Sequence, residues 1–287
     1  MQLGVVFPQT EIGPEPDPIR EYALAAEAAG YEHLLVYDHV LGADPNRPEG
    51  FSGPYDKNSL FHEPLVLFGY LAGITDRLEL VTGILVLTQR QTALVAKQAT
   101  EVDLLSNGRL RLGIGVGWNS IEFEALGENF YNRGRRVEEQ IEVLRALWSK
   151  EAISFEGNYH SIVQAGINPL PLTRSIPIWI GGMSEPVIER VGRLSDGWFP
   201  QYRDPSELPL GIERVHAAAE AAGRSPTDIG IEARVQLGGN AQEAATTAND
   251  WIEAGATHIS VNTMNAGYTN VAEHIEAIEQ FRKAFVS

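Results

Sequence analysis

The sequence contains no cysteine, few basic residues and no long apolar run. The absence of cysteine excludes disulfides, thiolate metal sites and a cysteine nucleophile. With 22 Lys and Arg against 38 Asp and Glu, the net charge of −16 argues against binding nucleic acid through a positive surface. No stretch approaches the length of a membrane span, and "MQLGVVFPQ" lacks the features of a signal peptide. We therefore predict a cytoplasmic protein without a nucleic-acid or membrane partner.

Short apolar runs alternate with helical patterns along all 287 residues. Strict alternation of strand and helix, eight times, predicts an α/β fold, a single (β/α)8 TIM barrel spanning 1–287. Several helical patterns end in glycine, as is typical of a helix C-cap before a new strand. The predicted strands begin at Leu3, His33, Leu78, Arg109, Ile176, Gly197, Ile229 and His258, and the capping glycines are Gly30, Gly108, Gly223 and Gly255.

Three insertions interrupt the regular alternation. A loop rich in proline and glycine, 38–61, follows the second predicted strand, and a second insertion, 117–134, separates the fourth from the next helix. A small hairpin with a tail, 153–173, precedes the fifth strand. The first two insertions follow the carboxyl ends of strands, the face on which barrel enzymes carry their active sites.

The fourth predicted strand, "RLRLGIGVGWN", carries three glycines at alternate positions. Trp118 stands where a dinucleotide-binding fingerprint needs its third glycine, and a helix follows where that fold needs a second strand, so a Rossmann site is excluded. Because strand side chains alternate, Gly113, Gly115 and Gly117 share one face. A row of glycines indicates that another backbone or a flat ligand comes close.

Asp38 and His39 end the second predicted strand where the long loop begins. Histidine exchanges protons near neutral pH, and a neighbouring carboxylate can keep it charged or fix its orientation. The alternative is a turn or cap aspartate beside an incidental histidine. We predict no metal site, because the histidines show no ligand spacing and His62-Glu63 lacks the second histidine of a zinc helix.

Two further glycine positions allow a functional and a structural interpretation. Gly181 and Gly182 close a strand before a helix that Ser184 can cap, which is typical either of an anion site or of a tight turn. Gly83 lies inside an apolar run, where it indicates a bulge, an unusual peptide bond or plain packing in a crowded barrel.

Two long segments resemble the luciferase-like monooxygenase superfamily, in the branch that uses the deazaflavin coenzyme F420. They are "VTGILVLTQRQTALVAKQATEVDLLSNGRLRLGIGVGWNSIEFEALG" and "PIWIGGMSEPVIERVGRLSDGWF", and the resemblance runs from "LGVVFPQ" to "HISVNT". It implies a bacterial luciferase-like barrel that binds a flavin or deazaflavin ring at the carboxyl ends of its strands. It also implies a homodimer.

The resemblance also implies roles for individual residues. Asp38 and His39 are the expected catalytic pair beside the reactive centre of the cofactor, with His39 as the main candidate. A non-prolyl cis peptide is expected between Gly83 and Ile84, behind the ring. The remaining expected cofactor contacts are Gly115, Gly117 and Asn119 after the fourth strand, and Gly181, Gly182 and Met183 in a phosphate-binding turn.

One departure from the family concerns the substrate. The sugar-phosphate dehydrogenases carry a glutamate general acid just after the strand-four glycine, and this sequence has Trp118 there. With Phe51, Tyr55 and Phe61 from the long loop, Trp118 predicts an aromatic pocket. The alternative for these side chains is loop packing.

The resemblance predicts an F420-dependent oxidoreductase. Such an enzyme transfers a hydride between C5 of the deazaflavin and a small organic substrate, with His39 moving the accompanying proton. The first alternative is a two-component monooxygenase that uses FMN on the same barrel. The second is a non-catalytic flavin-binding protein.

Overall fold

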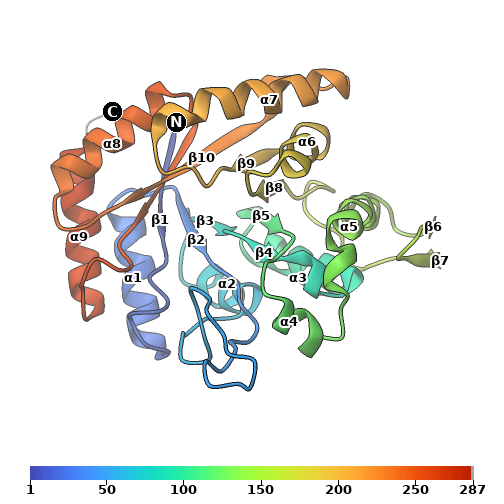
Figure 1. Cartoon of the computed structure of the whole chain (residues 1–287), viewed down its shortest axis with the longest axis horizontal. Helices are drawn as coiled ribbons and strands as arrows, with labels where there is room; N and C mark the ends of the chain where they lie inside the picture. The colour runs from blue at the N-terminus through green and yellow to red at the C-terminus, as the bar shows by residue number, and fades with distance from the viewer. Residues whose placement is uncertain (286–287) are drawn as a thin grey trace.

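The computed structural model describes residues 1–285 and places eight parallel strands in a closed barrel surrounded by helices (Figure 1). The hydrogen-bonded order is β3-β2-β1-β11-β10-β9-β8-β5, and pairing of β3 with β5 closes the ring. The predicted barrel is therefore confirmed. Its strands are β1 Gln2–Val6, β2 His33–Val36, β3 Glu79–Thr82, β5 Leu110–Gly115, β8 Ile178–Gly181, β9 Gly197–Phe199, β10 Gly230–Gln236 and β11 His258–Asn262.

The helical patterns form helices close to their predicted bounds. The four glycines expected at helix ends all have positive φ, between 71° and 108°, which explains why glycine stands there. These helices are α1 Pro16–Ala28, α2 Pro64–Ala72, α3 Thr92–Leu105, α5 Arg133–Ser149, α6 Glu185–Leu194, α7 Leu208–Ala221, α8 Ala241–Glu253 and α9 Val271–Ala284. Within residues 1–285, none is long and apolar enough to span a bilayer.

The third predicted strand is interrupted. It consists of β3 and a short β4 (Leu85–Val86), and both pair with β5. Val81 lies opposite Arg111 and Leu85 opposite Ile114, so four steps along this strand oppose three along β5. One extra residue in one strand is a bulge. The Gly83–Ile84 peptide bond within it is cis, as the resemblance implied.

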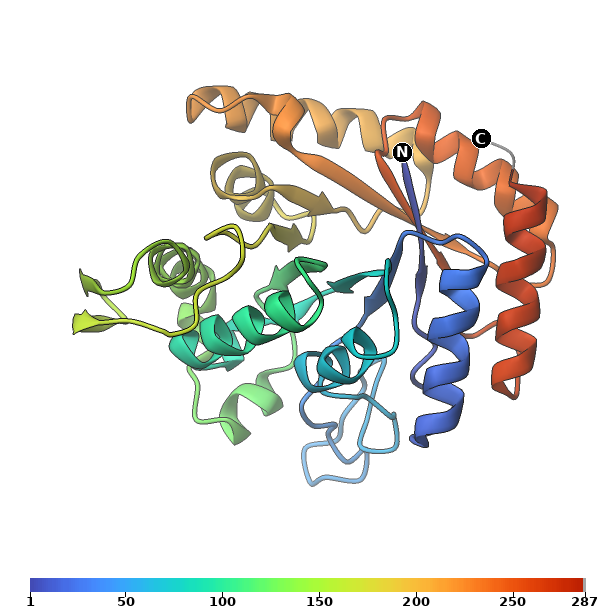
Figure 2. The ribbon, with the colours of Figure 1, turned by 180° about the vertical axis from the view of Figure 1, so that it is seen from behind.

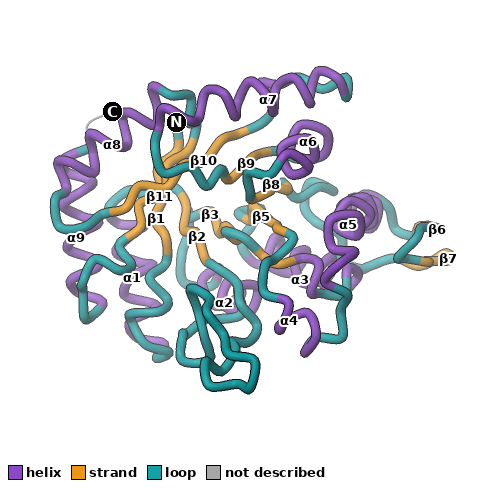
Figure 3. The backbone as a smooth tube through the Cα atoms, viewed as in Figure 1, coloured by secondary structure: helices purple, strands orange, loops and turns teal. Residues whose placement is uncertain are grey.

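The insertions lie outside the regular barrel. The loop after β2 forms a long excursion before α2 (Figure 3), and it lies at the same edge of the molecule as α4 (Ser120–Ala125), a helix within the insertion after β5. The predicted hairpin forms as β6 (Ile153–Glu156) and β7 (Ser161–Ala165), and it projects away from the barrel (Figure 2).

Apolar side chains form two separate clusters. The larger one fills the space between the barrel and its helices and includes the fully buried Trp148 and Phe281. The smaller one fills the barrel interior below the carboxyl ends of the strands, and its buried members are Val6, Leu35, Val81, Trp179, Phe199 and Met264. The barrel interior is therefore filled with side chains, and these close off the bottom of any site at the barrel mouth.

Charged side chains fill the opposite half of the barrel interior. The Glu232 carboxylate accepts hydrogen bonds from Arg111 Nη1 at 2.6 Å and from the Ser260 hydroxyl, and it lies 3.2 Å from His33 Nε2. All four residues are at most 2% exposed. Burial opposes the charge, but His33 and Arg111 hold the pKa of Glu232 well below its ordinary value. These partners compensate the buried charge.

We expect the protein to lose stability as the pH falls below 6.5, the ordinary pKa of histidine. Burial and the nearby Arg111 lower the pKa of His258 to about 3. The unfolded chain then takes up the proton first, so this contribution is complete above pH 6.5 and is lost as the pH falls toward about 3. Melting temperatures measured from about pH 8 to about pH 5 should fall less steeply for His258→Gln than for the wild type. Parallel curves would contradict this expectation.

Candidate active site

His39 lies just beyond β2, at the mouth of the barrel, and is surrounded by aromatic rings. Its ring centroid lies 4.8 Å from that of Phe61, 5.4 Å from Tyr55 and 5.8 Å from Trp118. Phe51 stacks on Trp118 at 6.2 Å. The aromatic residues of the two insertions therefore come together as predicted, but Phe61 and Tyr55 pack on the histidine itself, which is the packing role that the sequence left open.

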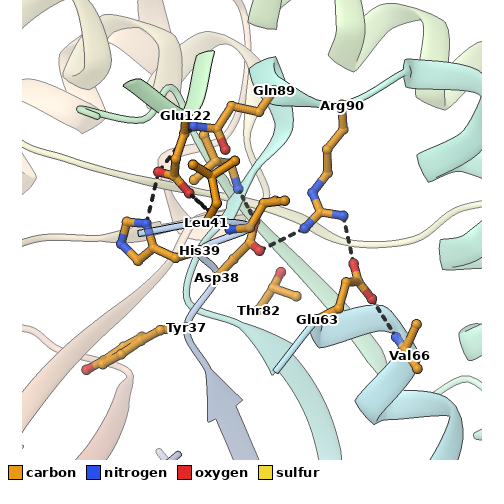
Figure 4. A network of polar contacts seen from close by, with 12 residues as sticks. Tyr37, Asp38, His39, Leu41, Glu63, Val66, Thr82, Gln89, Arg90 and Glu122 are labelled. Atoms are coloured by element: carbon orange, nitrogen blue, oxygen red, sulfur yellow. Dashed lines mark hydrogen bonds and ion pairs between the residues drawn. The ribbon is translucent and has the colours of Figure 1, made fainter. Parts of the chain in front are cut away.

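Glu122, on α4, holds the other side of His39 (Figure 4). Its Oε2 lies 3.0 Å from His39 Nδ1, while Oε1 accepts the backbone amides of Val40 at 3.0 Å and Leu41 at 3.3 Å. The glutamate is 1% exposed. Burial alone would raise its pKa, but His39 and the two amides hold the pKa of Glu122 below its ordinary value. One carboxylate thus joins the two insertions.

Asp38 points away from His39 (Figure 4). Its carboxylate accepts the Val86 amide at 2.9 Å and an Arg90 guanidinium N–H at 2.7 Å, and Arg90 also binds Glu63 at 2.7 Å. Burial raises the pKa of Asp38, while Arg90 and the Val86 amide oppose that rise. Asp38 therefore ties the end of β2 to β4, and Glu122 takes the orienting role that the sequence assigned to the adjacent carboxylate.

The glycines of β5 make room for protein atoms. A Cβ on Gly113 would meet the backbone carbonyl of Thr82. The Thr82 side-chain hydroxyl donates in turn to the Gly113 carbonyl at 2.6 Å. A Cβ on Gly115 or Gly181 would meet the Ile84 side chain. The sequence left open whether another backbone or a flat ligand comes close to these glycines, and at Gly113 it is another backbone. Gly115 and Gly181 shape the mouth through Ile84, which follows the cis bond.

The turn after β8 is fixed from β9. The Gly182 amide donates to the Phe199 carbonyl at 3.2 Å, and Trp198 Nε1 donates to the Gly182 carbonyl at 2.7 Å. Ser184 is the N-cap residue of α6, but its hydroxyl makes no capping bond, contrary to expectation. Within residues 1–285, the amides of Met183 and Ser184 have no acceptor, and Met183 is 40% exposed. Such free amides can hold an anion.

The remaining predicted residues lie on the insertion after β5. Gly117 has a φ of +73°, and Asn119 caps α4 by accepting the Ile121 amide at 3.2 Å. Asn119 and His39 both line a pocket of about 200 Å³ at the mouth. No cluster of three or more side chains able to hold a metal ion occurs in the described part of the chain.

Sequence reasoning missed Glu122 and Arg90. The segment 117–134 is expected only as an insertion before the next helix, and no helix is predicted within it, whereas it contains α4. The spacing of Asn119 and Glu122 resembles a capping box and is a signal for that helix. Nothing in the sequence marks Arg90, because its partner Asp38 is 52 positions away.

The family model described as luciferase-like monooxygenase matches residues 1–284. An uncharacterized protein of Mycobacterium tuberculosis is 35% identical over 216 residues, covering 73% of this chain and 74% of the relative. The FMNH2-dependent dimethylsulfone monooxygenase of Pseudomonas fluorescens is 31% identical over 228 residues, which cover 78% of this chain and 58% of the relative. The F420-dependent glucose-6-phosphate dehydrogenase of Amycolatopsis mediterranei is 30% identical over 243 residues, which cover 83% of this chain and 69% of the relative.

Solved structures agree with this fold. An F420-dependent secondary alcohol dehydrogenase in complex with an F420-acetone adduct superimposes with a TM-score of 0.82 at 18% identity, covering 100% of this chain and 99% of that one. The F420-dependent tetrahydromethanopterin reductase of Methanopyrus kandleri superimposes with a TM-score of 0.75 at 16% identity, covering 99% of this chain and 97% of that one. The barrel, its mouth and the match along nearly the whole chain lead to one conclusion: the protein belongs to the luciferase-like monooxygenase family.

Proposed function

We propose that the chain is an F420-dependent oxidoreductase that transfers a hydride between C5 of the deazaflavin and a small organic substrate. The observation that carries this proposal is His39 at the barrel mouth, held through Nδ1 by Glu122. Its Nε2 has no hydrogen-bond partner within residues 1–285, so it is free to serve a substrate. The F420-dependent relative and structural neighbour support the choice of cofactor.

The residues at the mouth fit a ring with a phosphate-bearing arm. Ile84, seated between Gly115 and Gly181, offers an apolar bed, and the free amides of Met183 and Ser184 suit the phosphate. The bound deazaflavin would supply the hydride acceptor or donor at C5. We propose that Gly83, Gly117, Asn119 and Gly182 complete the cofactor site, and that the buried Asp38 supports it only by holding the end of β2.

His39 would handle the proton of the reaction. When a substrate hydroxyl is oxidised, Nε2 accepts the hydroxyl proton, and the Glu122 carboxylate stabilises the imidazolium that forms. In the reverse direction the same nitrogen returns the proton. Phe61 and Tyr55 keep the imidazole in place and shield it from water.

A second candidate is an FMN-dependent monooxygenase. The relative that uses reduced FMN is 31% identical to this chain, and FMN also carries a phosphate on a ribityl arm. The turn at Gly182 would therefore serve either cofactor.

Binding decides between the two cofactors. Titration of the purified protein with F420 and with FMN, followed through the fluorescence of each cofactor at matched concentrations, should give a Kd for F420 at least about tenfold lower, equivalent to about 1.4 kcal/mol. Reduced FMN is measured anaerobically by competition with F420. Tighter binding of either form of FMN would overturn the proposal and direct the search to oxygen-dependent assays with a reductase.

Two variants of one residue test the location of the phosphate. Ser184 has a φ of −66°, which proline adopts, so Ser184→Pro removes the amide donor while Ser184→Ala keeps it. A hydrogen bond to a charged group contributes roughly 1.5–3 kcal/mol, so Ser184→Pro should bind cofactor at least about tenfold more weakly than Ser184→Ala. Equal affinities would place the phosphate elsewhere.

A further inference from the structure

We infer that Glu122 is a positioning residue that fixes the tautomer of His39, keeping the proton on Nδ1 and leaving Nε2 unprotonated toward the substrate. Its effect on turnover rests on the proposed function. The tautomer itself is a property of the free protein, and the two can be tested separately.

The hydrogen bonds of Glu122 determine where the proton lies. Its Oε1 accepts two backbone amides, from Val40 and Leu41, and amides can only donate. Two amide donors to a carboxylate favour its ionised form, which has acceptors alone. Oε2 therefore needs a donor from His39, 3.0 Å away, and that donor is Nδ1–H. In a neutral imidazole the other nitrogen is then an acceptor.

The neighbouring groups leave Glu122 as the determinant. The Asp38 carboxylate is already engaged by Arg90 and by the Val86 amide. Gln89 Nε2 lies 3.5 Å from Glu122 Oε2, so it adds a further donor to the same carboxylate. The aromatic rings packed on His39 hold the plane of the imidazole, which keeps the same nitrogen facing Glu122.

Replacing Glu122 by glutamine should reverse the tautomer without changing the shape of the site. The amide oxygen of Glu122→Gln has to stay with the Val40 and Leu41 amides, which can only donate. The new NH2 group then faces His39 Nδ1, which must become an acceptor, so the proton moves to Nε2. The nitrogen that faces the substrate would lose its capacity to accept a proton.

A matched control exists elsewhere in the chain. Glu139 holds His160 Nδ1 at 2.8 Å and accepts the amides of Asn158 and Tyr159, each at 2.7 Å. His160 Nε2 faces the Thr92 hydroxyl, which can donate or accept. Oε1 of Glu139 accepts both the Tyr159 amide and His160 Nδ1, so the amide oxygen of Glu139→Gln can keep both donors. This variant changes a histidine–glutamate pair away from the mouth and should leave the tautomer of His39 unchanged.

The test is ¹⁵N NMR of protein labelled at its seven histidines. Two-bond proton–nitrogen correlations identify the protonated nitrogen of each ring, and the signal lost in His39→Asn assigns His39. We expect His39 protonated on Nδ1 in the wild type and on Nε2 in Glu122→Gln. With F420 as probe, Glu122→Gln should lower kcat about 10²-fold, while the Kd for F420 stays within about threefold, and Glu139→Gln should change neither.

The outcomes separate the two proposals. A wild-type His39 protonated on Nε2, or an unchanged pattern in Glu122→Gln, overturns the tautomer assignment whatever the activity. The predicted reversal in a protein that neither binds nor turns over F420 overturns the proposed function and supports the assignment. The wild-type spectrum decides the assignment even where Glu122→Gln does not fold.

Discussion

Asparagine in place of His39 should lower turnover by a factor of about 10²–10⁴, the range expected when a general acid or base is removed, and should leave the Kd for F420 within about threefold. The asparagine Nδ2 takes the place of His39 Nδ1 and can still donate to Glu122. It puts no titrating nitrogen where Nε2 stood. Steady-state kcat and KM, with the cofactor Kd from fluorescence, measure the two effects.

Two further variants make this comparison specific. His39→Ala also removes the donor to Glu122, so it should lose stability as well as turnover, because a buried carboxylate loses a partner. His160→Asn makes the same replacement in the other histidine–glutamate pair and should keep full activity. Full activity in His39→Asn would remove His39 from the mechanism.

Replacing Arg111 by methionine should cost about 3–5 kcal/mol of unfolding free energy, the usual effect of removing one partner of a buried ion pair. Arg111 is 2% exposed and donates to Glu232 at 2.6 Å, inside the barrel. The variant leaves the Glu232 carboxylate with only His33 and Ser260. Denaturant unfolding should show the loss directly, and the melting temperature should fall by roughly 10 °C.

A double-mutant cycle tests the reason for that loss. With Glu232→Leu added, no fully buried carboxylate is left unpaired, because Glu79, the other partner of Arg111, has a side chain that is 30% exposed and reaches water. The double variant should therefore lose less stability than the sum of the two single variants. His33 and Ser260 can still bond to each other at 2.9 Å. Strictly additive losses would show that packing, and not the buried charge pair, determines the cost of Arg111→Met.

The sequence predicted the barrel because its signals are local. Each strand is a short apolar run, each helix has its own period, and the glycines at Gly30, Gly108, Gly223 and Gly255 end helices by a conformation that their own position requires. Even β9, with only three residues, lies where the alternation placed it.

The site was only partly predictable because its contacts are distant in sequence. His39 and Glu122 are 83 positions apart, and the short helix that brings Glu122 inward lies in an insertion in which no helix was predicted. Asp38, the neighbour of His39 in sequence, was the natural candidate for its partner, but the Asp38 carboxylate binds Arg90 instead. Alternation was right for Gly113 and Gly115 but wrong for Gly117, which lies beyond the end of β5 with a φ of +73°. It also could not show that Ile84 fills the space beside Gly115.

The way in which Glu122 supports His39 has an evolutionary consequence. Glu122 binds the backbone amides of Val40 and Leu41, and these bonds do not depend on which side chains those positions carry. Val40 is 44% exposed, and Leu41 lines the pocket beside the histidine. Mutations at both positions can therefore accumulate and alter what the pocket accepts, while the histidine keeps its geometry. Under the proposed function, substrate preference can change at these two positions while His39 keeps its orientation.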